Sequence, residues 1–210
     1  MKRNPTPNAI LKVVEIFHSI QGEGRNTGRS AVFVRLSNCN KNCWYCDTDW
    51  SVGTEMTAAE ILTEVRKHSS PNDYPNNIII WTGGEPTLQL NNQILDVFFE
   101  YYNCIETNGT NPVPENIEYI SCSPKVSQEI LNKNFKSVNE FRYPIGEGFE
   151  IPDIASLPPA DNYYVSPLFI GEEKKRFQPD EKNINYCIEF VKNNPAWKMS
   201  IQLHKFLNVR

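Results

Sequence analysis

Short β-prone runs alternate along the chain with segments whose apolar residues have helical spacing, and this alternation predicts an α/β fold. Strands that are separated by helices are expected to pair in parallel through right-handed crossovers. Several runs also end in a polar, glycine-containing turn, and α/β proteins gather their chemistry where parallel strands end. We therefore expect one largely parallel sheet with the functional residues along one edge.

Two kinds of pattern locate the individual elements. Ile78-Ile79-Ile80 is apolar throughout, as expected for a strand that is covered on both faces. Thr57-Ala58-Ala59-Glu60 matches a capping box, which predicts that a helix begins there. The sequence predicts strands over residues 11–19, 31–36, 77–81, 104–107, 119–122, 138–143, 163–167 and 197–203. It predicts helices over residues 57–68, 92–102 and 127–133, and one that follows residues 178–181 and ends near residue 193.

Length and composition indicate one globular domain over residues 1–210, with residues 1–10 as a flexible N-terminal segment. Hydrophobic residues make up 40% of the chain and charged residues 22%, which is ordinary for such a domain. The net charge of −4 and the lack of a basic stripe argue against direct binding of nucleic acid. The polar N-terminus does not resemble a signal peptide, and no segment has the roughly eighteen consecutive apolar residues that a membrane span needs.

The six cysteines divide into a cluster of three and three single residues. Cys104, Cys122 and Cys187 each lie in an apolar run, where a free cysteine packs as a small hydrophobic side chain. This distribution suits a reducing compartment better than a disulfide framework, so we expect a cytoplasmic protein.

The clustered residues Cys39, Cys43 and Cys46 have the spacing C-x3-C-x2-C, which lets one tight loop bring three thiolates toward one point. A closed structural zinc site needs four ligands, and no fourth cysteine stands nearby. A four-iron cluster held by three cysteines would keep one iron open for a small molecule. A loop of buried or zinc-binding cysteines is the alternative interpretation of the same spacing.

Polar groups also follow three further predicted strands. These groups are Thr82-Gly83-Gly84-Glu85, Glu106-Thr107-Asn108-Gly109 and Ser123-Pro124-Lys125. Together with the cysteine loop they place four polar clusters at the carboxyl edge of the expected sheet. Arg35, inside the apolar strand that precedes the cysteines, is either an edge residue or a two-pronged ligand for a carboxylate.

The cysteine loop resembles the signature of the radical S-adenosylmethionine (SAM) enzymes, whose open iron binds the amino and carboxylate groups of SAM. Further motifs occur in the order found in one branch of this superfamily, the 7-carboxy-7-deazaguanine synthase family. These motifs are Ser19-Ile20-Gln21-Gly22-Glu23-Gly24, Phe33-Val34-Arg35-Leu36, Cys46-Asp47-Thr48, Thr82-Gly83-Gly84-Glu85-Pro86, Glu106-Thr107-Asn108-Gly109-Thr110, Ser123-Pro124-Lys125 and Ser200-Ile201-Gln202-Leu203-His204-Lys205-Phe206-Leu207. The resemblance covers nearly the whole chain, from about residue 11 onward.

The resemblance implies an abbreviated, partial (β/α) TIM-like barrel of the radical SAM type and a homodimer. It implies a carbon–nitrogen lyase that converts 6-carboxy-5,6,7,8-tetrahydropterin to 7-carboxy-7-deazaguanine with loss of ammonia, on the route to queuosine and other 7-deazaguanines. The cofactors would be a 4Fe-4S cluster, SAM and Mg2+, and a flavodoxin or ferredoxin would donate electrons. SAM would be regenerated in each turnover, after its 5′-deoxyadenosyl radical has taken hydrogen from the substrate.

The same resemblance assigns roles to residues of this chain. Cys39, Cys43 and Cys46 would hold the cluster, and Thr48 would bind Mg2+, a hard cation that prefers oxygen ligands. Gly84 would leave room for backbone groups to meet the methionine ammonium. The SAM-binding residues would be Tyr45, Cys46, Asp47, Gly84, Ser123, Pro124, Lys125, Gln178, Pro179, Asp180 and Glu181. The substrate-binding residues would be Ile20, Gln21, Gly22, Glu23, Arg35, Thr82, His204 and Arg210, with Arg35 pairing with the substrate carboxylate and Arg210 acting through its α-carboxylate.

Other interpretations stay open on the sequence alone. Thr48 and Asp47 could instead cap a turn, and His204 could be a surface residue. Asp180-Glu181 stands where the family has a hydrophobic residue followed by an acid, which leaves the nucleoside contacts there open. The alternative functions are another radical SAM reaction, such as glycyl-radical activation, and a zinc-binding module without turnover.

Overall fold

The computed structural model describes residues 3–46, 48–168, 181–207 and 209, and it confirms the α/β fold. Within these residues a single sheet has the strand order β3-β1-β2-β4-β5-β6-β7-β8-β9. The strands are β1 (Ile10–Ile20), β2 (Ser30–Leu36), β3 (Thr54–Thr57), β4 (Ile78–Gly83), β5 (Tyr102–Thr107), β6 (Tyr119–Cys122), β7 (Val138–Ile145), β8 (Ala160–Pro167) and β9 (Lys198–Met199). The helices are α1 (Ala58–Arg66), α2 (Asn92–Leu95), α3 (Gln128–Asn134), α4 (Glu181–Asn193) and α5 (Leu203–Leu207).

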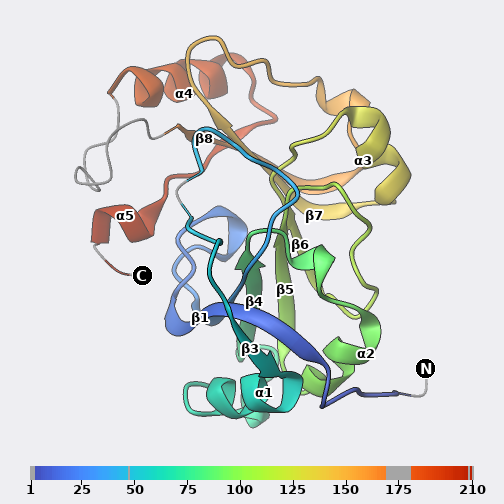
Figure 1. Cartoon of the computed structure of the whole chain (residues 1–210). Coiled ribbons are helices and arrows are strands. Elements are labelled where there is room, and N and C mark those ends of the chain that lie inside the picture. The colour runs from blue at the N-terminus through green and yellow to red at the C-terminus, as the bar shows by residue number, and fades with distance from the viewer. Residues whose placement is uncertain (1–2, 47, 169–180, 208, 210) are drawn as a thin grey trace.

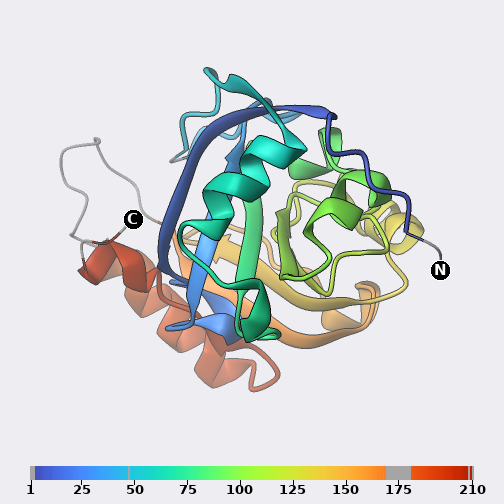
Figure 2. The ribbon, with the colours of Figure 1, turned by 90° about the horizontal axis from the view of Figure 1, so that it is seen from below.

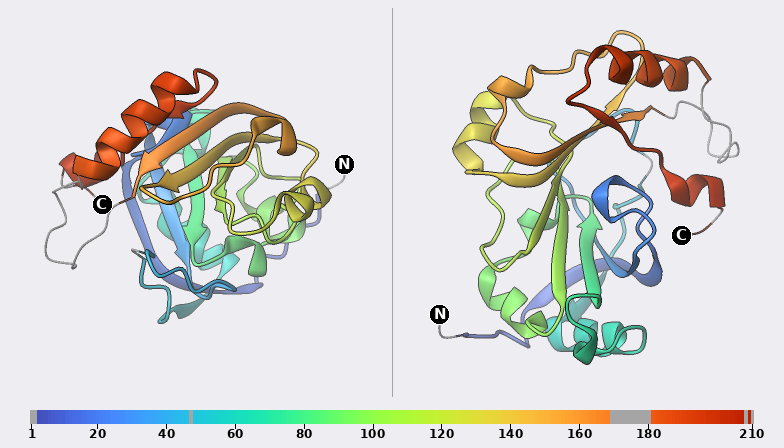
Figure 3. Two further views of the ribbon diagram at one scale, coloured as in Figure 1. Left: turned by 90° about the horizontal axis from the view of Figure 1, so that it is seen from above. Right: turned by 180° about the vertical axis from the view of Figure 1, so that it is seen from behind.

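The sheet is parallel over most of its width. From β2 through β9, each strand pairs in parallel with the next one in the sheet. The long first strand, β1, is antiparallel to both of its neighbours, β2 and β3. The sheet curves strongly without closing, and α4 lies along its outer side next to β8 (Figures 1 and 3). This open, curved sheet is the expected partial barrel.

Helix α1 covers the outer face of the first half of the sheet (Figure 2). Its residues Ile61 and Val65 are fully buried against a core that includes Val34 of β2 and Trp81 of β4. The helix begins with the predicted capping box, because the Thr57 hydroxyl accepts from the N–H of Glu60 at 3.2 Å and the Glu60 carboxylate accepts from the N–H of Thr57 at 2.7 Å. Successive side chains of a strand point to opposite faces of the sheet. The strand residues that pack under α1 therefore identify their neighbours as the ones that point into the barrel.

The inner face of the sheet changes character along the strands. Its lower layer is apolar and contains Phe17, Ala31, Phe33, Ile78, Ile80, Cys104 and Tyr119. Two residues further along β2, β4 and β5, the same face carries Arg35, Thr82 and Glu106. The inner face thus becomes polar at the carboxyl ends of the parallel strands, as the sequence predicted. None of the helices in the described part of the chain is both long and apolar enough to cross a membrane.

The structure corrects two of the predicted elements. The helix expected over residues 92–102 ends at Leu95, and a 3-10 turn (Asp96–Phe98) follows it. Tyr102 is already in β5, where its N–H donates to the carbonyl of Asn77 at 3.1 Å. The helical spacing of Ile94, Leu95, Phe98 and Phe99 extended the prediction, although the α-helix itself ends before Asp96.

The last expected strand is also shorter than predicted. Instead of a strand over residues 197–203, the structure has a two-residue strand, β9, and then helix α5. The chain leaves the sheet after Ser200, whose N–H donates to the carbonyl of Val165, and Leu203 then donates to the carbonyl of Gly22 at 3.0 Å. Contacts with the loop after β1 thus replace the expected pairing. At the other edge of the sheet, strand β3 was not predicted from the sequence.

The N-terminal segment, expected to be flexible, makes several contacts from Arg3 onward. The N–H of Asn4 donates to the carboxylate of Asp96 at 2.7 Å, and the N–H of Thr6 donates to the carbonyl of Gln93 at 3.1 Å. The Arg3 guanidinium lies 4.0 Å from the centre of the Phe99 ring. These contacts attach residues 3–9 to α2 and the turns after it, on the side of the molecule opposite α5 (Figure 1).

Candidate active site

The loop that follows β2 carries the three clustered cysteines. β2 ends at Leu36, and Asn38 turns the chain with a φ of 68°, a left-handed conformation that asparagine tolerates. The N–H of Cys46 donates to the carbonyl of Cys43 at 3.0 Å, which makes the turn tight. Cys39 and Cys43 are half-buried and Cys46 is exposed, all as free thiols. Among the residues that the structure describes, no three His, Cys, Asp or Glu side chains converge closely enough to hold a metal ion, so the loop carries the thiols without closing them into a ligand set.

The Gly84 backbone packs directly beneath the start of this loop. The N–H of Gly84 donates to the carbonyl of Leu36 at 2.9 Å, and the N–H of Glu85 donates to the carbonyl of Asn38 at 2.8 Å. A Cβ on Gly84 would lie 1.9 Å from the Asn38 carbonyl oxygen, far inside contact distance. Gly84 is therefore required by the close approach of two loops. Its expected role in leaving room for the methionine ammonium stays a prediction.

The buried carboxylate of Glu85 joins the loops that follow β4 and β5. It accepts from the hydroxyl of Thr107 at 2.8 Å, from the N–H of Asn108 at 2.7 Å and from the hydroxyl and N–H of Thr87 at 2.6 and 3.1 Å. The Asn108 amide in turn donates to the side-chain oxygen of Asn40, inside the cysteine loop, at 2.9 Å. Three loops at the carboxyl edge are thus connected by hydrogen bonds around one acid.

The predicted SAM residues Ser123, Pro124 and Lys125 lie in the next loop along the sheet. The N–H of Ser123 donates to the carbonyl of Thr107 at 2.8 Å, and the N–H of Lys125 donates to that of Asn108 at 2.9 Å. The Lys125 ammonium lies 5.6 Å from the centre of the Tyr45 ring, so this loop reaches the cysteine loop. Burial lowers the pKa of Lys125, and the neighbouring cysteine thiols oppose that shift.

Some predicted site residues cannot be placed with the others. Asp47, Gln178, Pro179, Asp180 and Arg210 lie outside the described residues. Glu181 is described as the exposed first residue of α4.

Arg35 lies in β2, between β1 and β4, and so it is not on an edge strand. Its Nε donates to Glu15 Oε1 at 2.9 Å, and its Nη1 lies 3.4 Å from the hydroxyl oxygen of Thr48. Across the sheet it is in register with Thr82 of β4. The structure therefore places the predicted carboxylate ligand, Arg35, beside the predicted magnesium ligand, Thr48.

A second polar group lies where β1 and β5 end. β1 ends at Ile20, and the following residue, Gln21, donates its amide to Glu106 Oε1 at 3.1 Å. Thr82 donates to Glu106 Oε2 at 2.8 Å, and Arg142 of β7 donates to Oε1 at 2.7 Å. Burial alone would raise the pKa of Glu106, but the Arg142 charge and these hydrogen bonds outweigh it and lower the pKa to about 2. Glu106 is thus held as an ionised acceptor.

The loop after β1 is fixed by the C-terminal segment. Leu203 N–H donates to the Gly22 carbonyl, and Gln202 donates its amide to Glu23 Oε1 at 2.9 Å. A Cβ on Gly22 would lie 2.2 Å from Nδ1 of His204, so this histidine packs directly on the loop backbone. The predicted substrate residues from the two ends of the chain are therefore brought together.

Two residues of this group, Glu140 and Arg142, were missed by the sequence analysis. Both lie on the inner face of β7 and are almost fully buried, at 2% and 5% exposure. Glu106 stood in a recognised motif but was given no role. The signal that could have identified them is the spacing of two between charged residues in a strand, which places both on one face. Isolated charges in a buried strand require partners, and here the partners are each other.

The cysteine loop has the donor chemistry that an iron–sulfur cluster requires. Cys39, Cys43 and Cys46 are thiols on one loop at the accessible edge of the barrel, with at least part of each side chain unburied. The other three cysteines, Cys104, Cys122 and Cys187, are buried, and burial raises the pKa of each thiol, that of Cys187 to about 12. Burial raises the pKa of Cys39 as well, but its side chain stays partly accessible, so accessibility is what makes the three clustered cysteines fit as cluster ligands.

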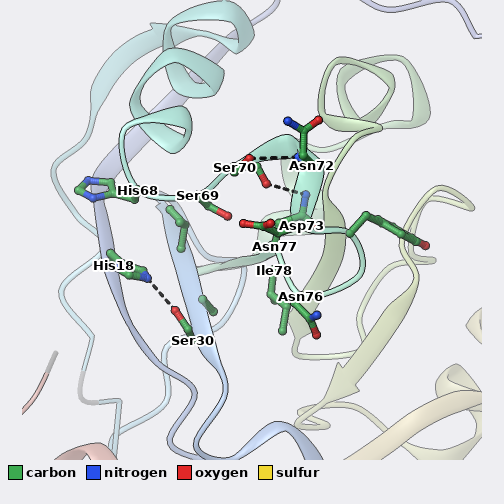
Figure 4. Close-up of a pocket in the computed structure, with 13 residues that line it drawn as sticks. His18, Ser30, His68, Ser69, Ser70, Asn72, Asp73, Asn76, Asn77 and Ile78 are labelled. Carbon is green, nitrogen blue, oxygen red and sulfur yellow. Dashed lines mark hydrogen bonds between the residues drawn. The ribbon is translucent and has the colours of Figure 1, made fainter.

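A separate cavity of about 480 Å³ lies at the opposite end of the strands (Figure 4). It is lined by His18, by residues 30–32 and by most of the residues between His68 and Ile78, and the His18 ring nitrogen lies 2.7 Å from the Ser30 hydroxyl. It begins where β2 and β4 begin, and none of the predicted site residues lines it. The candidate active site is therefore the polar edge, and this cavity is not part of it.

The partial barrel and its three-cysteine loop define a radical SAM protein, and the radical SAM superfamily model matches residues 34–145. The chain is 38% identical over 203 residues to the 7-carboxy-7-deazaguanine synthase of Bacteroides thetaiotaomicron, covering 96% of this chain and 100% of that protein. It is 34% identical to the 7-carboxy-7-deazaguanine synthase of Neisseria meningitidis, covering 99% of both chains. The chain therefore belongs to the 7-carboxy-7-deazaguanine synthase family.

The fold is also shared with a solved structure. The crystal structure of QueE from Escherichia coli superposes with a TM-score of 0.67, covers 93% of this chain and 95% of its own, and is 22% identical in sequence. Family membership makes this chain a radical SAM lyase that uses a 4Fe-4S cluster and SAM. It also decides against the zinc-binding module and the glycyl-radical activase.

Proposed function

We propose that this chain converts 6-carboxy-5,6,7,8-tetrahydropterin to 7-carboxy-7-deazaguanine, with loss of ammonia, in 7-deazaguanine biosynthesis. The observation that carries this assignment is the distribution of charge at the carboxyl edge. Arg35 offers a cation on one side, whereas Glu106 and Glu23 offer acceptors on the other. The substrate matches this polarity, because it has a carboxylate at one end and the N–H donors of its pyrimidine ring at the other.

On the cofactor side, Cys39, Cys43 and Cys46 would hold the cluster. When bound, the cluster and SAM supply the one-electron chemistry that begins the reaction. The chain itself positions them through the loops that Glu85 joins, and Tyr45 and Lys125 would form one wall of the SAM site. SAM would bind across the mouth of the barrel, where the loops after β2, β4, β5 and β6 meet.

On the substrate side, we propose that Thr48 is the protein ligand of Mg2+. Its hydroxyl lies beside the Arg35 guanidinium, so a magnesium ion there would lie close to the group that binds the substrate carboxylate. A hard divalent ion next to a carboxylate orients it and stabilises charge without proton transfer. Gln21, Gly22, Glu23, Thr82 and His204 would contact the ring system, together with Ile20 and the terminal carboxylate of Arg210.

We further propose that the protein works as a cytoplasmic homodimer that receives electrons from a flavodoxin or ferredoxin. It would not bind nucleic acid directly. Sedimentation velocity of the anaerobically reconstituted protein tests the dimer, and a single species at the monomer mass of 24.2 kDa would contradict it.

One anaerobic incubation tests the activity. Reconstituted protein is given SAM, reductant, Mg2+ and 6-carboxytetrahydropterin, and mass spectrometry should detect 7-carboxy-7-deazaguanine. Tetrahydropterin without the carboxylate is the matched control substrate, and it should give no deazaguanine because it cannot engage Arg35. Absence of product from the carboxylated substrate, in protein that contains iron and sulfide and cleaves SAM, would overturn the assignment.

A further inference from the structure

Arg142 lies beneath the candidate substrate site with three carboxylates around it. Its Nη2 is 2.7 Å from Glu106 Oε1, its Nη1 is 3.3 Å from Glu23 Oε2, and its Nε is 3.1 Å from Glu140 Oε1. The Nε also donates to the hydroxyl of Ser121 on β6. Each nitrogen of the guanidinium therefore serves a different part of the barrel: β5, the loop after β1, and β6 with β7.

Burial separates the residues of this network into an inner and an outer layer. The side chains of Arg142 and Glu140 are 7% and 2% exposed, whereas those of Glu106 and Glu23 are 27% and 17% exposed. The arginine thus lies behind the two outer acids and cannot itself be the first group that a ligand meets. The outer acids carry the accessible oxygens.

We propose that Arg142 is a positioning residue for substrate recognition, which fixes Glu106 and Glu23 side by side so that their carboxylates accept hydrogen bonds from the N–H groups of the substrate ring. This inference rests on the proposed function, because it assumes that the ring edge binds on this side. A planar guanidinium suits the role, since its fork presents donors in fixed directions. A lysine would supply the charge but could not hold three acids in one plane.

Three further contacts make Glu106 and Glu23 a preformed pair of acceptors. Gln21 and Thr82 hold the Glu106 carboxylate, and Gln202 holds that of Glu23. Two acids brought this close would repel each other without a cation between them. Loss of Arg142 would therefore both loosen the pair and favour protonation of Glu106.

The test is the affinity for 6-carboxypterin, the fully oxidised and unreactive analogue of the substrate, measured on reconstituted protein with SAM bound. Arg142→Met should raise its Kd roughly ten-fold or more at pH 7.5. Its Kd should rise several-fold further at pH 5.5, because Glu106 without its cation becomes protonated and loses an acceptor. Arg142→Lys should raise the Kd less and give a flat profile. Arg66→Met, which removes an exposed arginine paired with Glu100, is the matched control and should change nothing.

Other titrating groups must be kept constant in this comparison. The groups that face the network are Glu23 and Arg25 from the loop after β1, Cys104 from β5, Tyr119 from β6, Glu140 from β7, Tyr164 from β8 and, through Gly22, His204 from α5. Of these side-chain types, an imidazole is the one that ordinarily titrates between pH 5 and 8. Every variant keeps His204, so its contribution cancels in the difference between variants.

The substitution Arg142→Met is then repeated in a Glu106→Gln variant, where its effect shows whether Arg142 acts through Glu106. There, adding Arg142→Met should raise the Kd by a smaller factor than it does in the wild-type protein and should add less pH dependence, since only Glu23 remains for Arg142 to position. This double variant also carries no unpaired acid at position 106, and it replaces the single variant if Arg142→Met does not fold. Full additivity of the two substitutions, or an unchanged Kd in folded Arg142→Met, would overturn the inference. Wild-type protein that neither binds 6-carboxypterin nor forms product would instead overturn the proposed function.

Discussion

Two buried glutamates hold the two sides of the active site, and they are satisfied in different ways. Glu85 has no exposed surface, and in the described part of the chain its donors are neutral: the hydroxyl and N–H of Thr87, the hydroxyl of Thr107 and the N–H of Asn108. Glu140 is 2% exposed, and its partners include a guanidinium, that of Arg142. The first anchors the loops around the cysteines, and the second anchors the substrate side.

The neutral partners of Glu140 show how that anchor works. It accepts from the hydroxyls of Tyr119 and Ser121 at 2.7 and 2.8 Å and from the N–H of Arg25 at 2.9 Å. Gly24 must be a glycine there, because its φ is 68° and a Cβ would lie 2.2 Å from Glu140 Oε1. The acid thereby ties the loop after β1 to β6 and β7.

The difference between the two anchors follows from what each side has to bind. Glu85 is held by hydrogen bonds from hydroxyl and N–H donors, so within the described residues it fixes its loops without an ion pair. On the substrate side the protein has to present further acids, and Arg142 compensates their charge. One side is therefore organised by loop geometry and the other by charge.

The largest expected effect is loss of the cluster when one of its cysteines is replaced and both glutamates are left in place. Cys43→Ala should remove the cluster, so that iron content falls to background and no deazaguanine is formed, while the fold persists because neither glutamate is touched. Cys187→Ala is the matched control: it should cost about 1–2 kcal/mol of stability as a buried cavity but keep iron and turnover. Iron content and product are measured on the same preparations. Normal iron in Cys43→Ala would contradict the ligand assignment.

Substitution of Glu85 tests most directly whether this acid holds the cysteine side of the site. Glu85→Gln should destabilise the fold by about 2–4 kcal/mol, because an amide nitrogen would face the fixed N–H donor of Asn108 or the donors of Thr87 and Thr107. Iron content should fall with it, since this acid holds the loop on which the cysteines lie. Urea unfolding and iron analysis measure the two effects.

Glu140→Gln is the corresponding substitution on the substrate side, and it should weaken substrate binding rather than lower the iron content. Its cost should be smaller, about 1–2 kcal/mol, because Arg142 keeps Glu23 and Glu106 as counter-charges and one acid of a crowded group is removed. Iron content should stay normal while the Kd for 6-carboxypterin rises. Equal losses of iron in the two variants would refute the division of labour, and Glu64→Gln at the exposed pair with Lys67 provides the baseline.

The charged side should also make stability depend on pH. The pKa of Glu106 is lowered from 4.5 to about 2 in the folded chain, so its contribution is complete above the unfolded value and is lost as pH falls toward 2. The full contribution is about 3 kcal/mol, of which roughly a third to a half should be lost by pH 3.5. Urea unfolding of wild type and Glu106→Gln between pH 6 and 3.5 measures it. Parallel pH profiles for the two proteins would exclude this role for Glu106.

On the cysteine side, the arrangement of the loops could be predicted from the sequence. Its residues lie in contiguous motifs at the ends of apolar strands, and parallel pairing of β2, β4, β5 and β6 brings those ends together. Such motifs are visible because each loop is local in sequence. The new information concerns how the loops are held, as at Gly84, where the neighbouring Asn38 carbonyl explains the glycine.

The substrate side could be predicted less well, because its contacts are long-range. Glu106 and Arg142 are 36 residues apart, and Glu23 and Gln202 are 179 apart. No local pattern indicates which acid a buried arginine will meet. The same long-range contacts explain why the C-terminal strand is shorter than predicted: Leu203 pairs with Gly22 rather than with the sheet.

The smallest expected effect concerns Thr48, which lies between the two sides. Thr48→Ala should keep the cluster and SAM cleavage, since the residue follows the last cysteine and only its hydroxyl is removed. Product formation should slow about ten-fold, which corresponds to about 1.4 kcal/mol, because Mg2+ would lose its protein oxygen next to Arg35. Thr48→Ser retains that oxygen and should behave like wild type, and chelation of Mg2+ should slow wild type more than Thr48→Ala. If both proteins respond equally to chelation, Thr48 is only a structural neighbour of Arg35, and the two sides of the site are not joined by a metal ion.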